Sequence, residues 1–125
     1  MAPEMRLALA CLCAAASLSC FASAPERKHY TPAQYLKNYA LSACIANGFQ
    51  SGEVVSDALA AANGYKELGS LDIDAYNDAA ALGKAFLTRD YLSHEGSEKL
   101  ILMKCVDLFH SRELNQLARK YAKRK

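Results

Sequence analysis

Residues 31–48, TPAQYLKNYALSACIANG, carry a complete set of signals for one helix. Thr31 suits the N-cap, Pro32 suits the first helical position, and Gly48 suits the end of the helix. Between these ends, apolar side chains recur every three or four residues and include Cys44. The stretch therefore predicts a helix that carries one cysteine on its apolar side.

The chain beyond this helix shows further helical patterns separated by glycines, with no competing strand pattern. Gly64 is placed to end the first of these helices, and the stretch 97–110 is apolar on nearly every side, which predicts the central and most enclosed helix. The predicted fold class is all-α, a compact bundle of four to five helices. The stretches that carry the further helices are residues 51–64, 71–91, 97–110 and 112–125.

Two of these stretches predict which side chains face inward. A three-to-four-residue spacing in 71–91 places Ile73 and Tyr76 on the buried face. In the last helix, Ser111 is expected to form the N-cap, and Leu114 and Tyr121 are expected to face the core.

The N-terminal 24 residues have the pattern of a signal peptide. Residues 1–6 contain one basic side chain, and residues 7–22 are uncharged but too short for a membrane span, which takes about 20 apolar residues. Small residues place the cleavage boundary between Ala22 and Ala24. We therefore expect a signal peptide at 1–24, a periplasmic location, and one helical domain at 25–125.

An alternative interpretation of the leader concerns Cys20. The residues SLSC, 17–20, approximate a lipobox, in which Cys20 would be acylated and would anchor the protein to a membrane.

Removal of this leader leaves two of the five cysteines, Cys44 and Cys105. We predict that they are paired, because export places them where thiols oxidise and an even number without a C-x-x-C motif favours a structural bridge. Closing a loop of about 60 residues removes roughly 4 kcal/mol of unfolded-state entropy. The predicted bundle therefore contains one disulfide.

The charge of the predicted mature domain is small. The leader removes one of 15 basic residues and one of 13 acidic residues, so 14 and 12 remain and the net charge stays at +2. This balance does not favour nucleic acid or an anionic membrane as a partner. We expect membrane association only if Cys20 is lipidated.

No catalytic, cofactor-binding or metal-binding group is predicted. Paired cysteines supply no thiolate nucleophile. His110 and Glu113 have the spacing of two metal ligands on one helical face, but two ligands make half a site. Asp72, Asp74 and Asp78 fall at the start of a helix, where the helix dipole accounts for carboxylates without a cation.

Two stretches are not explained as core, residues 62–76 and the connector 88–99, TRDYLSHEGSEK. The connector is long for a helical domain, in which connections usually have about 2–8 residues. One interpretation is a solvated loop with Tyr91 folded back on the core. The other is a projecting loop that recognises a partner.

Four stretches in the same order and spacing resemble the type VI secretion amidase immunity proteins of family four. Together they extend over most of the predicted mature chain and include both cysteines. They are YALSACIANGF (39–49), GYKELGSLDIDAY (64–76), FLTRDYLS (86–93) and LILMKCVDLFHSRELNQLARKY (100–121).

The resemblance implies a periplasmic, all-helical homodimer without enzymatic activity. It implies that the dimer binds two copies of a cognate type VI secreted peptidoglycan amidase, a papain-like endopeptidase, and protects the cell from intoxication by itself or by sister cells. In that family one subunit contributes a helix for binding, and the other contributes a protruding loop that reaches the cleft of the enzyme. The alternative is a small periplasmic enzyme or an accessory lipoprotein.

We place these two elements at the helix beginning at Asp72 and at the loop Asp90–Glu98. The implied partner-binding residues are Asp72, Asp74, Asn77, Asp78, Tyr91, Leu92, Ser93, His94, Glu95, Gly96, Ser97 and Glu98.

Overall fold

The computed structural model describes residues 30–91 and 96–124, and within these ranges it contains five helices and no strand. The prediction of an all-α bundle is confirmed. The predicted signal peptide, residues 1–24, lies outside the described ranges and stays a prediction. The helices are α1 (Pro32–Gly48), α2 (Gly52–Leu68), α3 (Ile73–Leu87), α4 (Ile101–His110) and α5 (Arg112–Ala122).

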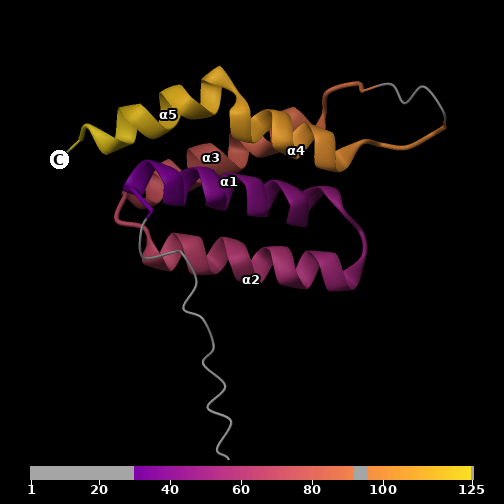
Figure 1. Ribbon diagram of the computed structural model, residues 1–125, viewed down its shortest axis with the longest axis horizontal. Helices are drawn as coiled ribbons and strands as arrows, with labels where there is room; N and C mark the ends of the chain where they lie inside the picture. The colour runs from indigo at the N-terminus through magenta and orange to yellow at the C-terminus, as the bar shows by residue number, and fades with distance from the viewer. Residues whose placement is uncertain (1–29, 92–95, 125) are drawn as a thin grey trace, which may run out of the picture.

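α1 is the central helix, and it packs against all four others (Figure 1). Its predicted ends are confirmed. The Gln34 backbone N–H donates to Thr31 Oγ1 at 3.2 Å, and the Thr31 N–H donates to Gln34 Oε1 at 2.8 Å, which completes a capping box. The fully buried side chains of α1 cover about half of its circumference and include Leu36, Ala40 and Cys44 on one side.

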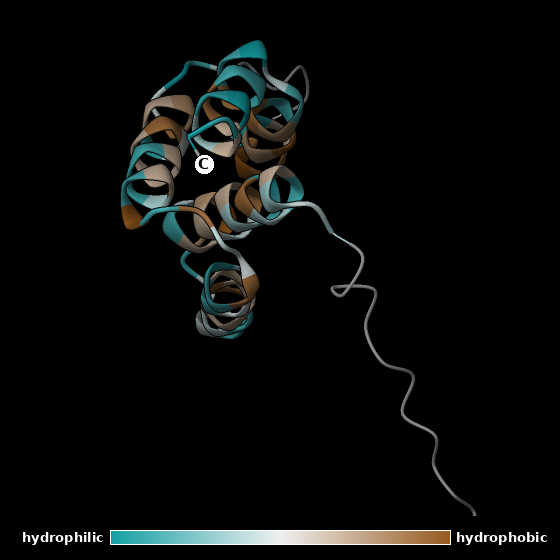
Figure 2. Ribbon diagram, turned by 90° about the vertical axis from the view of Figure 1, so that its left-hand side faces the viewer, coloured by the Kyte–Doolittle hydropathy of each residue, from teal (hydrophilic) through white to brown (hydrophobic). Residues whose placement is uncertain are grey.

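α2 lies outside the cluster formed by the other four helices (Figure 2). It runs back along α1 after a short turn and packs mainly against it, through the buried residues Ala58 and Ala62. The prediction that α2 ends at Gly64 is wrong, because the helix continues to Leu68. Gly64 lies where a side chain would meet open space, so the position is a tolerated helix interior rather than a helix end.

The prediction that 97–110 forms the most enclosed helix is also wrong. α4 buries Lys104, Cys105 and Leu108, but it leaves Leu102 and Met103 about half exposed, at 56% and 54%. Hydropathy records how many apolar side chains a stretch has, whereas burial depends on how many of its faces meet another helix. α4 lies at the edge of the bundle, and only one of its faces packs against other helices.

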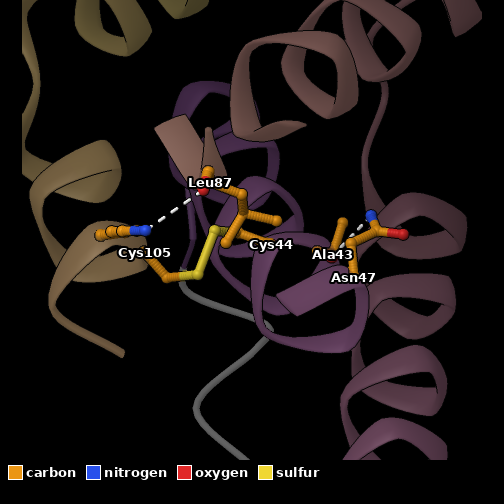
Figure 3. Close-up of a disulfide and its surroundings, with 6 residues drawn as sticks. Ala43, Cys44, Asn47, Leu87 and Cys105 are labelled. Carbon is orange, nitrogen blue, oxygen red and sulfur yellow. Dashed lines mark hydrogen bonds between the residues drawn. A yellow bond between two sulfur atoms is a disulfide. The ribbon is translucent and has the colours of Figure 1, made fainter. Parts of the chain in front are cut away.

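The predicted disulfide between Cys44 and Cys105 is confirmed and joins α1 to α4 across the core (Figure 3). The two Cα atoms are 5.6 Å apart, and both cysteines are almost completely buried. Large apolar side chains from the other helices surround the bridge, including Phe86 of α3, Leu108 of α4 and Leu114 of α5. The bridge therefore lies in the interior, where solvent does not reach it.

One residue, Ser111, both ends α4 and begins α5. Its Oγ donates to the Leu108 carbonyl at 2.7 Å and accepts the Leu114 backbone N–H at 3.1 Å. The predicted cap is confirmed, and so is the inward orientation of Leu114 and Tyr121.

Candidate partner-binding surfaces

The start of α3 is the first surface predicted to bind a partner. Asp72 is the N-cap residue, and Asp74 lies in the first turn, where the positive end of the helix dipole favours carboxylates. Asp72, Asp74 and Asn77 are exposed. Within the described residues the Asp72 side chain makes no capping hydrogen bond, which leaves its carboxylate available to another molecule.

The buried face of α3 differs in one position from the predicted face. Ala75, Tyr76 and Ala79 are buried, as is Gly83, whereas Ile73 is 60% exposed and the prediction for it is wrong. Ile73 stands one residue after the N-cap, at the end of the bundle where no other helix covers it. It therefore adds an apolar side chain to the acidic surface.

Asp78 is not a free carboxylate of this surface. The Tyr121 hydroxyl of α5 donates to Asp78 Oδ2 at 2.7 Å, and Lys120 Nζ lies 4.0 Å from the same oxygen. The hydrogen bond to Asp78 raises the pKa of Tyr121, so the hydroxyl keeps its proton to a higher pH than that of a free tyrosine. Asp78 thus ties α3 to α5, a contact 43 positions apart that the sequence pattern did not indicate.

The connection between α3 and α4 is the second predicted surface. Gly96, Ser97 and Glu98 are exposed, and the predicted binding residues Leu92–Glu95 lie outside the described residues. Tyr91 folds back on the protein, where its hydroxyl donates to Asp107 Oδ2 of α4 at 2.5 Å. The position of Tyr91 therefore agrees with the interpretation in which this residue folds back on its own chain.

The two predicted surfaces lie at opposite ends of α3 (Figure 1). From Asp74 to Leu87 the helix axis advances about 20 Å, at roughly 1.5 Å per residue. One chain does not bring the two surfaces together.

The exposed apolar side of α4 is a third surface, which the sequence interpretation missed. Leu102, Met103 and Val106 lie next to one another on this helix and are 41–56% exposed. The sequence interpretation predicted that residues 97–110 form the most enclosed helix, so it recognised these apolar side chains but expected them to be buried.

The described residues contain no group of three or more His, Cys, Asp or Glu side chains that could hold a metal ion. His110 ends α4 and Glu113 lies in the first turn of α5, so the change of helix at Ser111 removes the common face on which they were considered as ligands. Cys44 and Cys105 are bonded to each other. None of the helices in 30–91 and 96–124 has the length and hydropathy to cross a membrane.

The described residues thus form a small, disulfide-bridged helical domain with three exposed surfaces of interest: the start of α3, the connection between α3 and α4, and the apolar side of α4. The sequence model of Tai4, described as the type VI secretion system (T6SS) amidase immunity protein, matches residues 34–118. The chain belongs to this family, as the resemblance predicted. A comparison with curated protein sequences finds no match.

Solved structures agree with this assignment. A chain in the structure of the Tae4/Tai4 effector–immunity system from Salmonella typhimurium is 32% identical, with a TM-score of 0.73, over 78% of this chain and 96% of that one. A chain from a structure of new type VI-secreted toxins and self-resistance proteins in Serratia marcescens is 28% identical, with a TM-score of 0.68, over 79% of this chain and 86% of that one. The Tae4–Tai4 complex from Enterobacter cloacae has a chain of the same fold, at 20% identity and a TM-score of 0.68, over 77% of this chain and 97% of that one.

Proposed function

We propose that this protein is a periplasmic immunity protein that binds and inhibits a cognate type VI peptidoglycan amidase of the papain-like type. The observation that carries the proposal is the match to the immunity protein family over residues 34–118, together with the 32% identity to a chain of a Tae4/Tai4 effector–immunity structure. Binding at nanomolar strength takes about 12 kcal/mol, usually from roughly 1,600 Å² of buried surface. One connection alone rarely supplies this area, so the start of α3 serves as a second contact.

A homodimer would bring the two surfaces to one amidase. In a single chain they lie at opposite ends of α3, whereas in a dimer the α3 start of one copy can lie beside the connection of the other. This arrangement gives two equivalent sites and binds two amidases per dimer.

The exposed apolar side of α4 is the face that we assign to contact between the two copies. A second copy suits it because, across a two-fold axis, the same apolar side chains of each copy, Leu102, Met103 and Val106, can cover one another.

The inhibition is tested by titration of the protein, without residues 1–24, into a type VI peptidoglycan amidase of the papain-like type, with peptidoglycan cleavage as the measurement. We expect loss of amidase activity at one protein chain per amidase. Cleavage of peptidoglycan by the protein alone would favour the alternative, a small periplasmic enzyme. Cell fractionation with palmitate labelling separates a soluble periplasmic protein from one that is lipidated at Cys20.

The dimer is tested by light scattering on a size-exclusion column. Replacing Met103 with Glu places charges in the α4 contact, and we expect the mass to fall from two chains to one. Leu59→Glu is the matched control, because Leu59 of α2 is about as exposed, at 48% against 54%. A dimer that survives Met103→Glu but not Leu59→Glu would place the contact on α2 instead.

A further inference from the structure

Lys104 is the one buried charged residue in the described part of the chain, with 7% of its surface exposed. Its Nζ donates to the carbonyl of Leu87, the last residue of α3, at 3.2 Å. The carbonyls at the end of a helix lack partners within the helix and carry partial negative charge, so an ammonium group is stabilised there. Leu87 lies beside the disulfide (Figure 3), so this contact fixes the end of α3 close to the covalent link between α1 and α4.

Tyr91 is held by two side chains of the same face of α4. Its hydroxyl donates to Asp107, and Lys104 Nζ lies 5.7 Å from the centre of its ring. A hydrogen bond to a carboxylate is stronger than one between neutral groups. The same bond raises the pKa of Tyr91, so the phenol remains a donor to a higher pH than that of a free tyrosine.

Arg89 adds a weaker contact on the same side. Its guanidinium group lies 3.5 Å from the centre of the Phe86 ring, and its Nη2 lies 4.0 Å from Glu113 Oε1. Both charged side chains are about half exposed, so this ion pair contributes little. The position of the chain after α3 therefore depends mainly on Tyr91.

The connection also returns to the bundle at a fixed residue. Leu100 has φ 52° and ψ 39°, the left-handed conformation, which costs a residue with a Cβ roughly 1–2 kcal/mol. Such a residue persists where its surroundings determine its conformation. The Leu100 carbonyl accepts the backbone N–H of Lys104 at 3.1 Å, so Lys104 contacts the residue before the connection and the residue that ends it.

We propose that Lys104, Tyr91 and Asp107 form a clamp that fixes the direction in which the connection leaves α3, and that they are positioning residues for inhibition of the amidase. The inference rests on the proposed function. Tyr91 acts through Asp107 rather than through its own contact with the amidase. A segment whose ends are fixed before binding loses less conformational entropy on binding, so the clamp increases affinity without touching the partner.

A double-mutant cycle on Tyr91 and Asp107 tests the clamp, with inhibition of the amidase as the measurement. We expect Tyr91→Phe and Asp107→Ala each to weaken inhibition by about threefold, less than the roughly tenfold effect of losing a buried hydrogen bond to a charged group, because this bond is exposed to solvent. The double variant should be no weaker than either single variant, because both remove the same bond. Asp107→Asn retains an acceptor and should preserve part of the inhibition.

Thr88→Ala is the matched control, because the Thr88 hydroxyl bonds only within the end of α3, to the Ala85 carbonyl at 2.7 Å. We expect it to inhibit like the unmodified protein. Additive effects in the cycle, or a loss with Tyr91→Phe and none with Asp107→Ala, would show that Tyr91 contacts the amidase directly and would overturn the clamp.

Trypsin provides a second measurement that needs no amidase, because Arg89 and Lys99 are cleavage sites on either side of the undescribed residues. Tyr91→Phe and Asp107→Ala should be cut faster here than the Thr88→Ala control, while cleavage within the helices stays unchanged, because the lost bond acts on the connection. Unchanged cleavage would refute the clamp, and faster cleavage with unchanged inhibition would refute its positioning role. If the unmodified protein inhibits no amidase, the proposed function fails, while cleavage still decides whether the clamp exists.

Discussion

α2 and α4 are both attached to α1, but by different means. α4 is joined to it by the Cys44–Cys105 bond and contributes Leu108 to the common core. α2 buries only Ala58 and Ala62. Alanine side chains let two helices approach closely, but each buries little apolar surface. Because burial stabilises the fold by about 25 cal/mol per Å² of apolar surface, these two alanines contribute little.

The molecule thus consists of four helices, α1 and α3–α5, that share the core around the disulfide, and of α2, which contacts mainly α1. The start of α3, the connection and the clamp all belong to the four-helix part. An immunity protein must hold its proposed binding surfaces in place for long periods, and the connection begins at the end of α3 that lies beside the covalent link. We therefore expect α2 to open first in native-state hydrogen exchange.

Removing the disulfide should have the largest effect on stability. Cys44→Ala with Cys105→Ala should lower the free energy of unfolding by about 4 kcal/mol, because the unfolded chain regains the entropy of an open loop. Urea unfolding followed by circular dichroism gives this value, and the unmodified protein after reduction should show a similar loss. An unchanged midpoint would mean that packing alone holds α4 on α1.

Enlarging an alanine of α2 should have an intermediate effect. Ala62 is 3% exposed, so Ala62→Leu must push α2 away from α1 and should cost about 1–3 kcal/mol. Ala60→Leu on the exposed side is the control, for which we expect a change within about 0.5 kcal/mol. Equal stability of the two variants in urea would show that α2 is not held by close contact at Ala62.

Removing the tie between α3 and α5 should have the smallest effect. Tyr121→Phe loses the hydrogen bond to Asp78, and we expect a cost of about 1 kcal/mol, because Asp78 is partly exposed. Asp78→Asn keeps an acceptor and should cost less. Thermal unfolding measures both, and a Tyr121→Phe protein as stable as the unmodified one would remove Asp78 from the contacts that support α3.

The sequence predicted those parts of the fold that depend on local chemistry. Thr31, Pro32 and Ser111 determine helix starts through their own side chains or rings, and the structure confirms each of them. Gly64 misled the prediction, because a glycine in an exposed helix is tolerated at a cost of about 1 kcal/mol. The cysteine pairing was predictable because only two cysteines follow the leader.

The surfaces could be predicted only in part, because their contacts join residues far apart in the chain. The position of Asp72 and Asp74 at a helix start was predictable, because the helix dipole there favours carboxylates. The partners of Asp78 and Tyr91 lie 43 and 16 positions away, and no local spacing indicates them. The exposed side of α4 was missed for a similar reason, since hydropathy does not tell which face lacks a neighbour.

The disulfide also has a topological consequence. Cys44 precedes the connection and Cys105 follows it, so a peptide bond cut anywhere between them leaves two fragments that remain one covalent molecule. A protease that cleaves the connection therefore does not release α4 and α5 from α1, and the cut chain keeps its mass until it is reduced. Where proteases are present, such a chain can lose its backbone continuity and still keep its parts together.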